Sequence, residues 1–155
     1  MTLSMPTTQT TYNDRILPAQ AGQIADTRTF DSITRSAEGT IAFGVAVSRG
    51  TDLEKGCVQG GTLNKFLGVS IRDITVIHTT PDQYEIPENT GILTSGTIWV
   101  QVTGSPGPGD PVKFDGTTGK FSVSGGIGPL LGARYMTTTV APGLCKLHLG
   151  NYDQS

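Results

Sequence analysis

The sequence predicts an all-β protein: a single compact β-sandwich or barrel, jelly-roll-like, that carries an extended N-terminal arm. Three observations lead to this prediction. Only 15% of the residues are charged, so the helix formers Glu and Lys are scarce, whereas Thr, Val and Ile suit a pleated surface. The chain contains 21 Gly and 9 Pro spread along its length, which indicates many tight turns. Short apolar runs alternate with small or polar residues, and 155 residues are enough for one domain.

Residues 1–22 differ from the rest of the chain, and the β-domain is expected over residues 23–155. The first segment is rich in Thr and Gln and sustains neither a helical nor a strand period, which favours an extended arm. The arm combines an apolar cluster with one guanidinium, supplied by Tyr12, Arg15, Ile16 and Leu17. A purely solvating tail would not need these side chains, so we expect them to contact a partner surface; a disordered tail is the alternative.

The first half of the β-domain has four runs with strand character. Side chains alternate between two faces over 29–35 and again over 41–48, where the residues between the apolar ones are small. A weaker strand is expected near 55–59, and one or two strands over 66–77. The stretch 52–55 is the only place where we expect even a single helical turn.

The second half begins with residues 78–89, whose two prolines predict a surface loop. In the strand expected over 97–103, Ile98, Val100 and Val102 share one face, and Trp99, on the other face, is predicted to be largely buried. The turn residues at 115–119 predict a hairpin. Its strands and the last two strands are expected at 112–114, 120–123, 130–136 and 144–149. In the last of these, Cys145, Leu147 and Leu149 share one face.

The sequence predicts no catalytic, cofactor-binding or metal-binding residues. His78 and His148 are the only imidazoles, and neither stands in a recognisable catalytic motif. Glu85 and Glu88 flank an Ile-Pro pair in the expected loop, where acids usually serve as solvated charges. The glycines at 126–128 lack the following helix that a dinucleotide site needs. A small β-fold enzyme such as a nucleotide hydrolase is a remote alternative, and the motifs of trimeric dUTPases are not found.

Charge, hydropathy and cysteine content indicate which partners and which compartment to expect. The net charge is −2 and the eleven basic residues are scattered, so we expect no nucleic-acid partner. No apolar run is long enough to span a bilayer, and the N-terminus lacks the pattern of a secretory signal, so folding in a cytoplasm is expected. Cys57 and Cys145 form neither a zinc motif nor a disulfide framework. They are expected to be free thiols, with a disulfide formed after release from the cell as the alternative.

Several segments, taken in their order and spacing, resemble the structural cement proteins of tailed phages, which are capsid decoration proteins. The segments with this resemblance lie at 18–26, 41–50, 96–102, 108–112, 132–137 and 146–149. Together they cover most of the chain, although no single one is a strong motif. The family brings no catalytic residues with it.

The resemblance implies a virion structural protein that binds the outer surface of a phage capsid and stabilises it. The implied partners are the major capsid protein and the chain itself, as a homo-oligomer that is a dimer or a trimer. The implied location is the capsid exterior, after synthesis in the host cytoplasm. Tyr12, Arg15, Ile16 and Leu17 then become the expected contacts to the capsid or to a neighbouring subunit. A tail, baseplate or adsorption module is the alternative.

Overall fold

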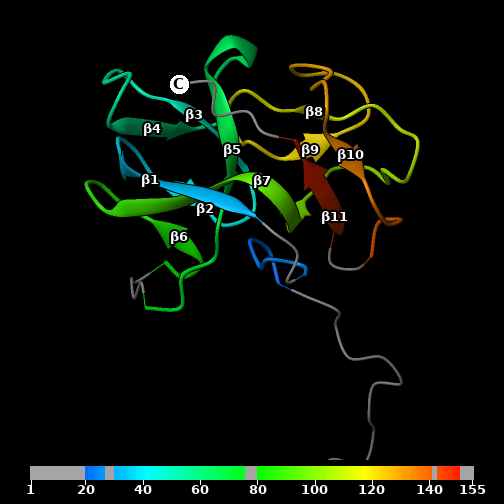
Figure 1. Cartoon of the computed structure of the whole chain (residues 1–155), viewed down its shortest axis with the longest axis horizontal. Coiled ribbons are helices and arrows are strands. Elements are labelled where there is room, and N and C mark those ends of the chain that lie inside the picture. The colour runs from blue at the N-terminus through cyan, green and yellow to red at the C-terminus, as the bar shows by residue number, and fades with distance from the viewer. Residues whose placement is uncertain (1–19, 27–29, 76–79, 141–142, 151–155) are drawn as a thin grey trace, which may run out of the picture.

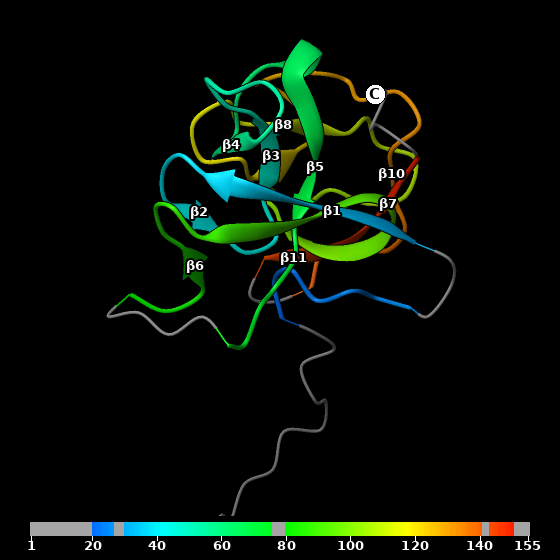
Figure 2. The ribbon, with the colours of Figure 1, turned by 60° about the vertical axis from the view of Figure 1, so that its left-hand side comes forward.

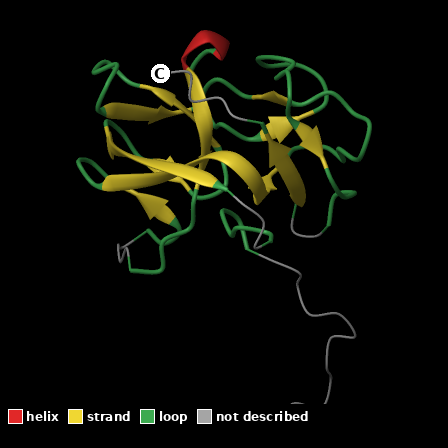
Figure 3. Cartoon of the chain, in the orientation of Figure 1, coloured by secondary structure: helices red, strands yellow, loops and turns green. Residues whose placement is uncertain are grey.

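The computed structural model describes residues 20–26, 30–75, 80–140 and 143–150. Within these ranges the regular structure is almost entirely β, with one short 3-10 helix, η1 (Figures 1 and 3). The all-β prediction is therefore confirmed. The elements are β1 (Asp31–Ala37), β2 (Ile41–Ala42), β3 (Ala46–Arg49), β4 (Gly56–Gln59), η1 (Leu63–Lys65), β5 (Phe66–Ser70), β6 (Gln83–Tyr84), β7 (Asn89–Gln101), β8 (Lys113–Phe114), β9 (Phe121–Ser122), β10 (Arg134–Tyr135) and β11 (Leu144–Leu149).

Five strands close into a barrel in the order β1-β4-β3-β5-β7. The ring closes because β1 pairs with β4 on one side and with β7 on the other. The β1–β4 pair is parallel and the other pairs of the ring are antiparallel. In Figures 1 and 2, β1 runs alongside β7 across the face of the molecule. Of the sandwich and the barrel that the sequence predicted, the structure has the barrel.

The long strand β7 joins the barrel to the remaining strands. Residues 89–95 of β7 pair with β1, and residues 96–101 pair with β11, to which β10 is attached. In Figure 1, β8, β9, β10 and β11 gather on one side of the barrel. The first half of β7 therefore closes the ring, and its second half holds the second layer of strands.

Alternate residues of the ring strands bury two separate clusters. The barrel cluster draws on all five ring strands and comprises Ala37, Ile41, Phe43, Val45, Val47, Cys57, Leu67, Tyr84 and Ile92. Sequence neighbours of these residues, such as Ala46, Phe66 and Leu93, belong to a second cluster between the ring and the strands β8 to β11. The face of β11 with Cys145, Leu147 and Leu149 packs into this second cluster, as its alternation predicted.

Several other strands lie where the sequence predicted them. The run 29–35 falls on β1, the run 55–59 on β4, and the hairpin around 115–119 on β8 and β9. The prediction over 97–103 falls on the second half of β7 and ends at Gln101. The last strand coincides with β11.

Three strand predictions were too long or misplaced. The run 41–48 is not one strand, because the chain turns at Phe43–Gly44 and so brings β2 into pairing with β6. Its alternation persists across the turn, since Phe43, Val45 and Val47 all point into the barrel cluster. The strand expected over 66–77 ends at Ser70, and residues 71–75 are not strand. The strand expected over 130–136 is only Arg134–Tyr135.

The predicted loop and the predicted helical turn also need correction. The stretch 78–89 contains β6, whose Tyr84 is almost fully buried, because this aromatic ring completes the barrel cluster. The helical turn lies at η1 rather than at 52–55. At 52–55 the Asp52 carboxylate accepts hydrogen bonds from the amides of Glu54 and Lys55, which fixes a turn instead.

Candidate functional site

The one described histidine, His148, has a structural environment. It lies half-buried in β11, and its Nδ1 is 3.1 Å from the hydroxyl of Thr97, its cross-strand partner in β7. His78 lies outside the described residues. Over the part of the chain that the structure describes, no group of three His, Cys, Asp or Glu side chains could hold a metal ion.

The acids Glu85 and Glu88 stabilise a turn. The Glu88 carboxylate accepts a hydrogen bond of 2.7 Å from the Glu85 amide, and the Glu88 amide donates to the Glu85 carbonyl at the same distance. The glycine run at 126–128 is also structural. Ile127 bridges to Phe114, and the segment continues into β10 rather than into a helix.

Cys57 and Cys145 are both buried and free, as expected. They lie in different apolar clusters, Cys57 in the barrel and Cys145 in the second cluster. Burial raises the pKa of each thiol above its usual value, which keeps both protonated and unreactive at neutral pH. Among the described ranges there is also no helix long and apolar enough to cross a membrane.

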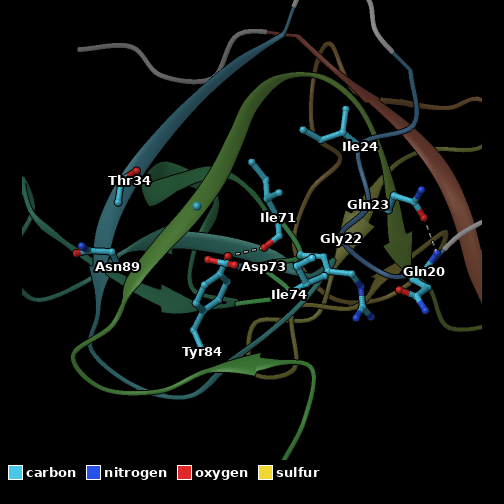
Figure 4. A pocket seen from close by; sticks show the side chains of 12 residues that line it. Gln20, Gly22, Gln23, Ile24, Thr34, Ile71, Asp73, Ile74, Tyr84 and Asn89 are labelled. Carbon is cyan, nitrogen blue, oxygen red and sulfur yellow. Dashed lines mark hydrogen bonds between the residues drawn. The ribbon is translucent and has the colours of Figure 1, made fainter. Parts of the chain in front are cut away.

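A groove of about 840 Å³ lies on the surface, and we call it the 71–74 groove (Figure 4). Residues of three regions form it: Gln20–Ile24 before β1, the loop 71–74 after β5, and the paired strands β1 and β7 near Tyr84. In Figure 4, Gln20, Gln23 and Ile24 lie across the groove from Thr34 and Asn89, with the loop residues between them. The groove is open and contains both apolar and polar side chains.

One wall of the groove is the segment 20–26, which we call the N-terminal segment. It lies along the second half of β7 as a short additional strand, with Ile24 opposite Ile98. The Gly22 amide donates to the Trp99 carbonyl at 2.8 Å, and the Trp99 amide donates to the Gln23 carbonyl at 3.0 Å. The Ala25 amide donates to the Thr97 carbonyl at 2.9 Å. This pairing satisfies the edge of the second half of β7 that lies opposite β11.

Arg72 holds the N-terminal segment to the loop. Its backbone amide donates to the Gly22 carbonyl at 2.8 Å, and its Nε donates to the Ala21 carbonyl at 3.0 Å. One terminal nitrogen of the same guanidinium lies 2.7 Å from Asp82 Oδ1, and the group stacks 5.1 Å from the centre of the Phe43 ring. A single side chain thus ties together three segments that are distant in sequence.

The next two loop residues, Asp73 and Ile74, line the groove. Asp73 accepts hydrogen bonds from the hydroxyl and the amide of Thr75, and these bonds lower the pKa of its carboxyl group, which is therefore ionised at neutral pH. Ile74 is 85% exposed, which is unusual for such a large apolar side chain. The strand pattern over 66–77 gave no sign of the groove. Its opposite wall comes from the N-terminal segment, where Ala21 is 51 positions from Arg72.

Trp99 is largely buried, as predicted, with 8% of its surface exposed. It forms a small cluster with Leu144, and Ala21 and Ala25 of the N-terminal segment pack against it. The Lys146 ammonium lies 5.5 Å from the ring centre. The predicted contact residues Tyr12, Arg15, Ile16 and Leu17 lie outside the described residues. The first described residue is Gln20.

The described molecule is a closed β-barrel, and the groups described above take part in turns, strand pairs or the core. A family model described as "Structural cement protein (E217 gp24/Pam3 gp6)" matches residues 8–150. The chain therefore belongs to this family of phage structural cement proteins. No curated protein matches the sequence.

A chain from a structure entitled "The capsid of Myoviridae Phage XM1" has the same fold. The TM-score is 0.74 at 16% sequence identity, and the match covers 94% of this chain and 98% of that chain. At this identity the likeness concerns the fold. It extends over nearly the whole length of both chains.

Proposed function

We propose that this protein decorates the exterior of a phage capsid and stabilises the shell by bridging neighbouring capsid subunits. Membership of the structural cement family, over residues 8–150, carries this proposal. The match begins within the arm, so it spans most of the arm as well as the barrel. A closed barrel with short turns suits a protein that must persist outside the cell.

The arm is the proposed clamp. Ordering an extended segment costs about 1–2 kcal/mol per residue in backbone entropy, which a partner surface must repay. Burial of Tyr12, Ile16 and Leu17, with the Arg15 guanidinium paired to a carboxylate, offers that repayment. Many copies on a symmetric lattice add their contacts through avidity.

The partners we propose are the major capsid protein and further copies of this chain, as a dimer or a trimer. The protein is made in the host cytoplasm and has no catalytic role in this proposal. The structural environments of His148, Glu85, Glu88 and both cysteines support a non-enzymatic role. The imidazole and both carboxylates form hydrogen bonds within the fold, and both thiols are buried.

The test is binding to heads that lack the protein. The full chain, a variant without residues 1–17 and a variant with those residues in scrambled order are each mixed with undecorated capsids and sedimented. The N-terminal segment is retained in every variant, so the barrel keeps its edge pairing. We expect the full chain to co-sediment and to raise the temperature at which heads rupture, and both variants to bind much more weakly.

The oligomer mass of each variant is measured alongside. A loss of mass with the loss of binding would assign the arm to the contact between copies, and an unchanged mass would assign it to the shell. Equal occupancy by all three proteins would show that the arm is only a tail. Failure of the full chain to bind any head would overturn the proposed function itself.

A further inference from the structure

We infer that the 71–74 groove is the docking site for this chain's own arm: in the free protein, residues 15–17 lie in the groove, with Ile16 and Leu17 against Ile74 and Arg15 facing Asp73. This inference goes beyond the proposed function, because it concerns the protein before it meets a shell. It assigns a ligand to this groove.

The first support is the length of the connection. Gln20 lines the groove, so the arm starts at its rim. An extended chain spans at most about 3.6 Å per residue, which puts Leu17 within about 11 Å of Gln20 and Arg15 within about 18 Å. A segment tethered this closely has an effective concentration in the millimolar range, so even weak contacts are populated.

The second support is the start of the arm. The Gln23 amide donates to the Gln20 carbonyl at 3.1 Å, and the Gln20 amide donates to the Gln23 side-chain oxygen at 3.1 Å. These two bonds close a turn, and both residues line the groove. Gln20, to which the preceding residues are joined, is therefore held in place beside the groove.

The third support is complementary chemistry in the same order. The loop presents an ionised carboxylate at Asp73 followed by an exposed isoleucine at Ile74, and the arm presents Arg15 followed by Ile16. The other cation in the groove, Arg72, is already engaged by Asp82 and the Ala21 carbonyl. The Asp73 carboxylate, the described negative group that lines the groove, can therefore pair with Arg15. Ile16 and Leu17 would then cover the exposed side chain of Ile74.

Trypsin cleavage at Arg15–Ile16 measures this docking, because a protease must hold the bond in an open, extended form. Cleavage of a segment that opens and closes rapidly follows the fraction of open molecules. The loss of residues 1–15 is followed by mass spectrometry in the full-length protein. We expect Ile74→Ser to speed this cleavage by about tenfold, and Asp73→Asn to speed it by a smaller factor.

The matched control is Leu131→Ser. Leu131 is 84% exposed, like Ile74, but does not line the groove, so its cleavage rate should equal that of the parent protein. Equal rates for the parent and Ile74→Ser would overturn the inference, as would an equal acceleration by Leu131→Ser. The acceleration should also persist over about a hundredfold dilution, since a tethered segment does not depend on concentration.

Protection that disappears on dilution would assign the groove to the arm of a second copy and overturn docking within one chain. None of these outcomes bears on capsid binding, which is measured separately by co-sedimentation. The free protein could lose its arm docking and still decorate heads, and in that case only the inference would fail.

Discussion

Trp99 shows how a single residue can be buried by a chain terminus rather than by the main core. Its side chain lies on the face of β7 opposite Ile98 and Val100, outside the two large clusters. Ala21 and Ala25 of the N-terminal segment cover it, together with Leu144. The burial of this ring therefore reports whether the segment is in place.

We expect Trp99→Ala to lower the free energy of unfolding by about 3–5 kcal/mol, because it empties a buried aromatic site. Trp99→Phe, which keeps an aromatic ring, should cost clearly less. Urea unfolding followed by circular dichroism measures both. A loss below about 1 kcal/mol for Trp99→Ala would mean that the ring contributes no more than an average side chain.

Tyr84 makes the fold sensitive to alkali. Its hydroxyl donates to the Ile71 carbonyl at 2.5 Å, and burial raises the pKa of the phenol from 10.0 to about 12. The folded state keeps a proton that the unfolded state releases, so stability is intact below pH 10 and falls as the pH rises toward 12. Burial also raises the pKa of Tyr135, Cys57 and Cys145, which adds to the same trend.

Tyr84→Phe should therefore reduce the loss of unfolding free energy at alkaline pH. For one such group this loss approaches about 1.4 kcal/mol per pH unit. At neutral pH the variant should be less stable by about 1 kcal/mol, because the Ile71 carbonyl loses its donor. Unfolding free energies measured between pH 7 and pH 11, as approximate limits, test both effects. Parallel pH profiles for the two proteins would contradict the assignment to Tyr84.

At the level of elements, the N-terminal segment depends on a glycine. Gly22 has a φ of +81°, a conformation that residues with a Cβ adopt at a cost. A Cβ at this position would lie 2.7 Å from the Arg72 amide nitrogen and 3.1 Å from the Gly44 nitrogen. The N-terminal segment thus approaches the loop 71–74 so closely that only glycine fits at position 22.

Gly22→Ala should cost about 2 kcal/mol or more, from backbone strain and the clash, and should loosen the segment. Hydrogen exchange should accelerate at the amides of Ala25 and Trp99, and the Trp99 emission should shift to the red. Gly39→Ala is the control, since a Cβ there meets nothing within 4 Å. Similar exchange in the two variants would show that the Gly22 contact does not hold the segment.

Strand alternation predicted the elements well where strands were long and regular, and less well where a glycine bent the chain. The alternation at β11 and in the second half of β7 gave both the strand and its buried face. The same signal over 41–48 hid the turn at Gly44, because the inward residues on either side keep the same spacing. The two-residue period of apolar side chains therefore does not reveal where the chain changes direction.

The candidate site was predictable only in part. The apolar cluster at Tyr12, Ile16 and Leu17 could be found from composition, and its role stays a prediction. The groove beside Arg72 could not, because it arises where Ala21 meets a loop some 50 residues later. No local sequence pattern predicts this contact between distant segments.

At the level of the whole molecule, the barrel closes through pairings that composition could not predict. The parallel pair β1–β4 and the antiparallel pair β1–β7 join strands that are far apart in sequence. Closure also needs β5 and β7 to approach closely at Gly68. A Cβ at Gly68 would collide with the Leu93 carbonyl and lie 3.1 Å from Ile92 Cγ2.

Gly68→Ala should therefore destabilise the whole barrel, by about 3 kcal/mol, because neither backbone can give way inside a closed ring. Gly91→Ala, in the neighbouring strand β7, is the control, since its Cβ would meet nothing nearer than 3.7 Å. We expect the control to stay within about 0.5 kcal/mol of the parent protein. Thermal unfolding by circular dichroism compares the two, and equal midpoints would contradict tight closure at Gly68.

The edge pairing of the N-terminal segment has a mechanical consequence. A pull on the arm enters the domain at Gln20 and passes through the Gly22 and Ala25 amides into β7. That strand is bonded to β1, β5 and β11, so tension arriving at one edge spreads over the barrel and the second layer together. We therefore expect tension on the arm to peel the N-terminal segment from β7 before the barrel unfolds, against the added hydrogen bond from Arg72 to the Ala21 carbonyl. Under such a load the barrel would remain folded after the segment has detached.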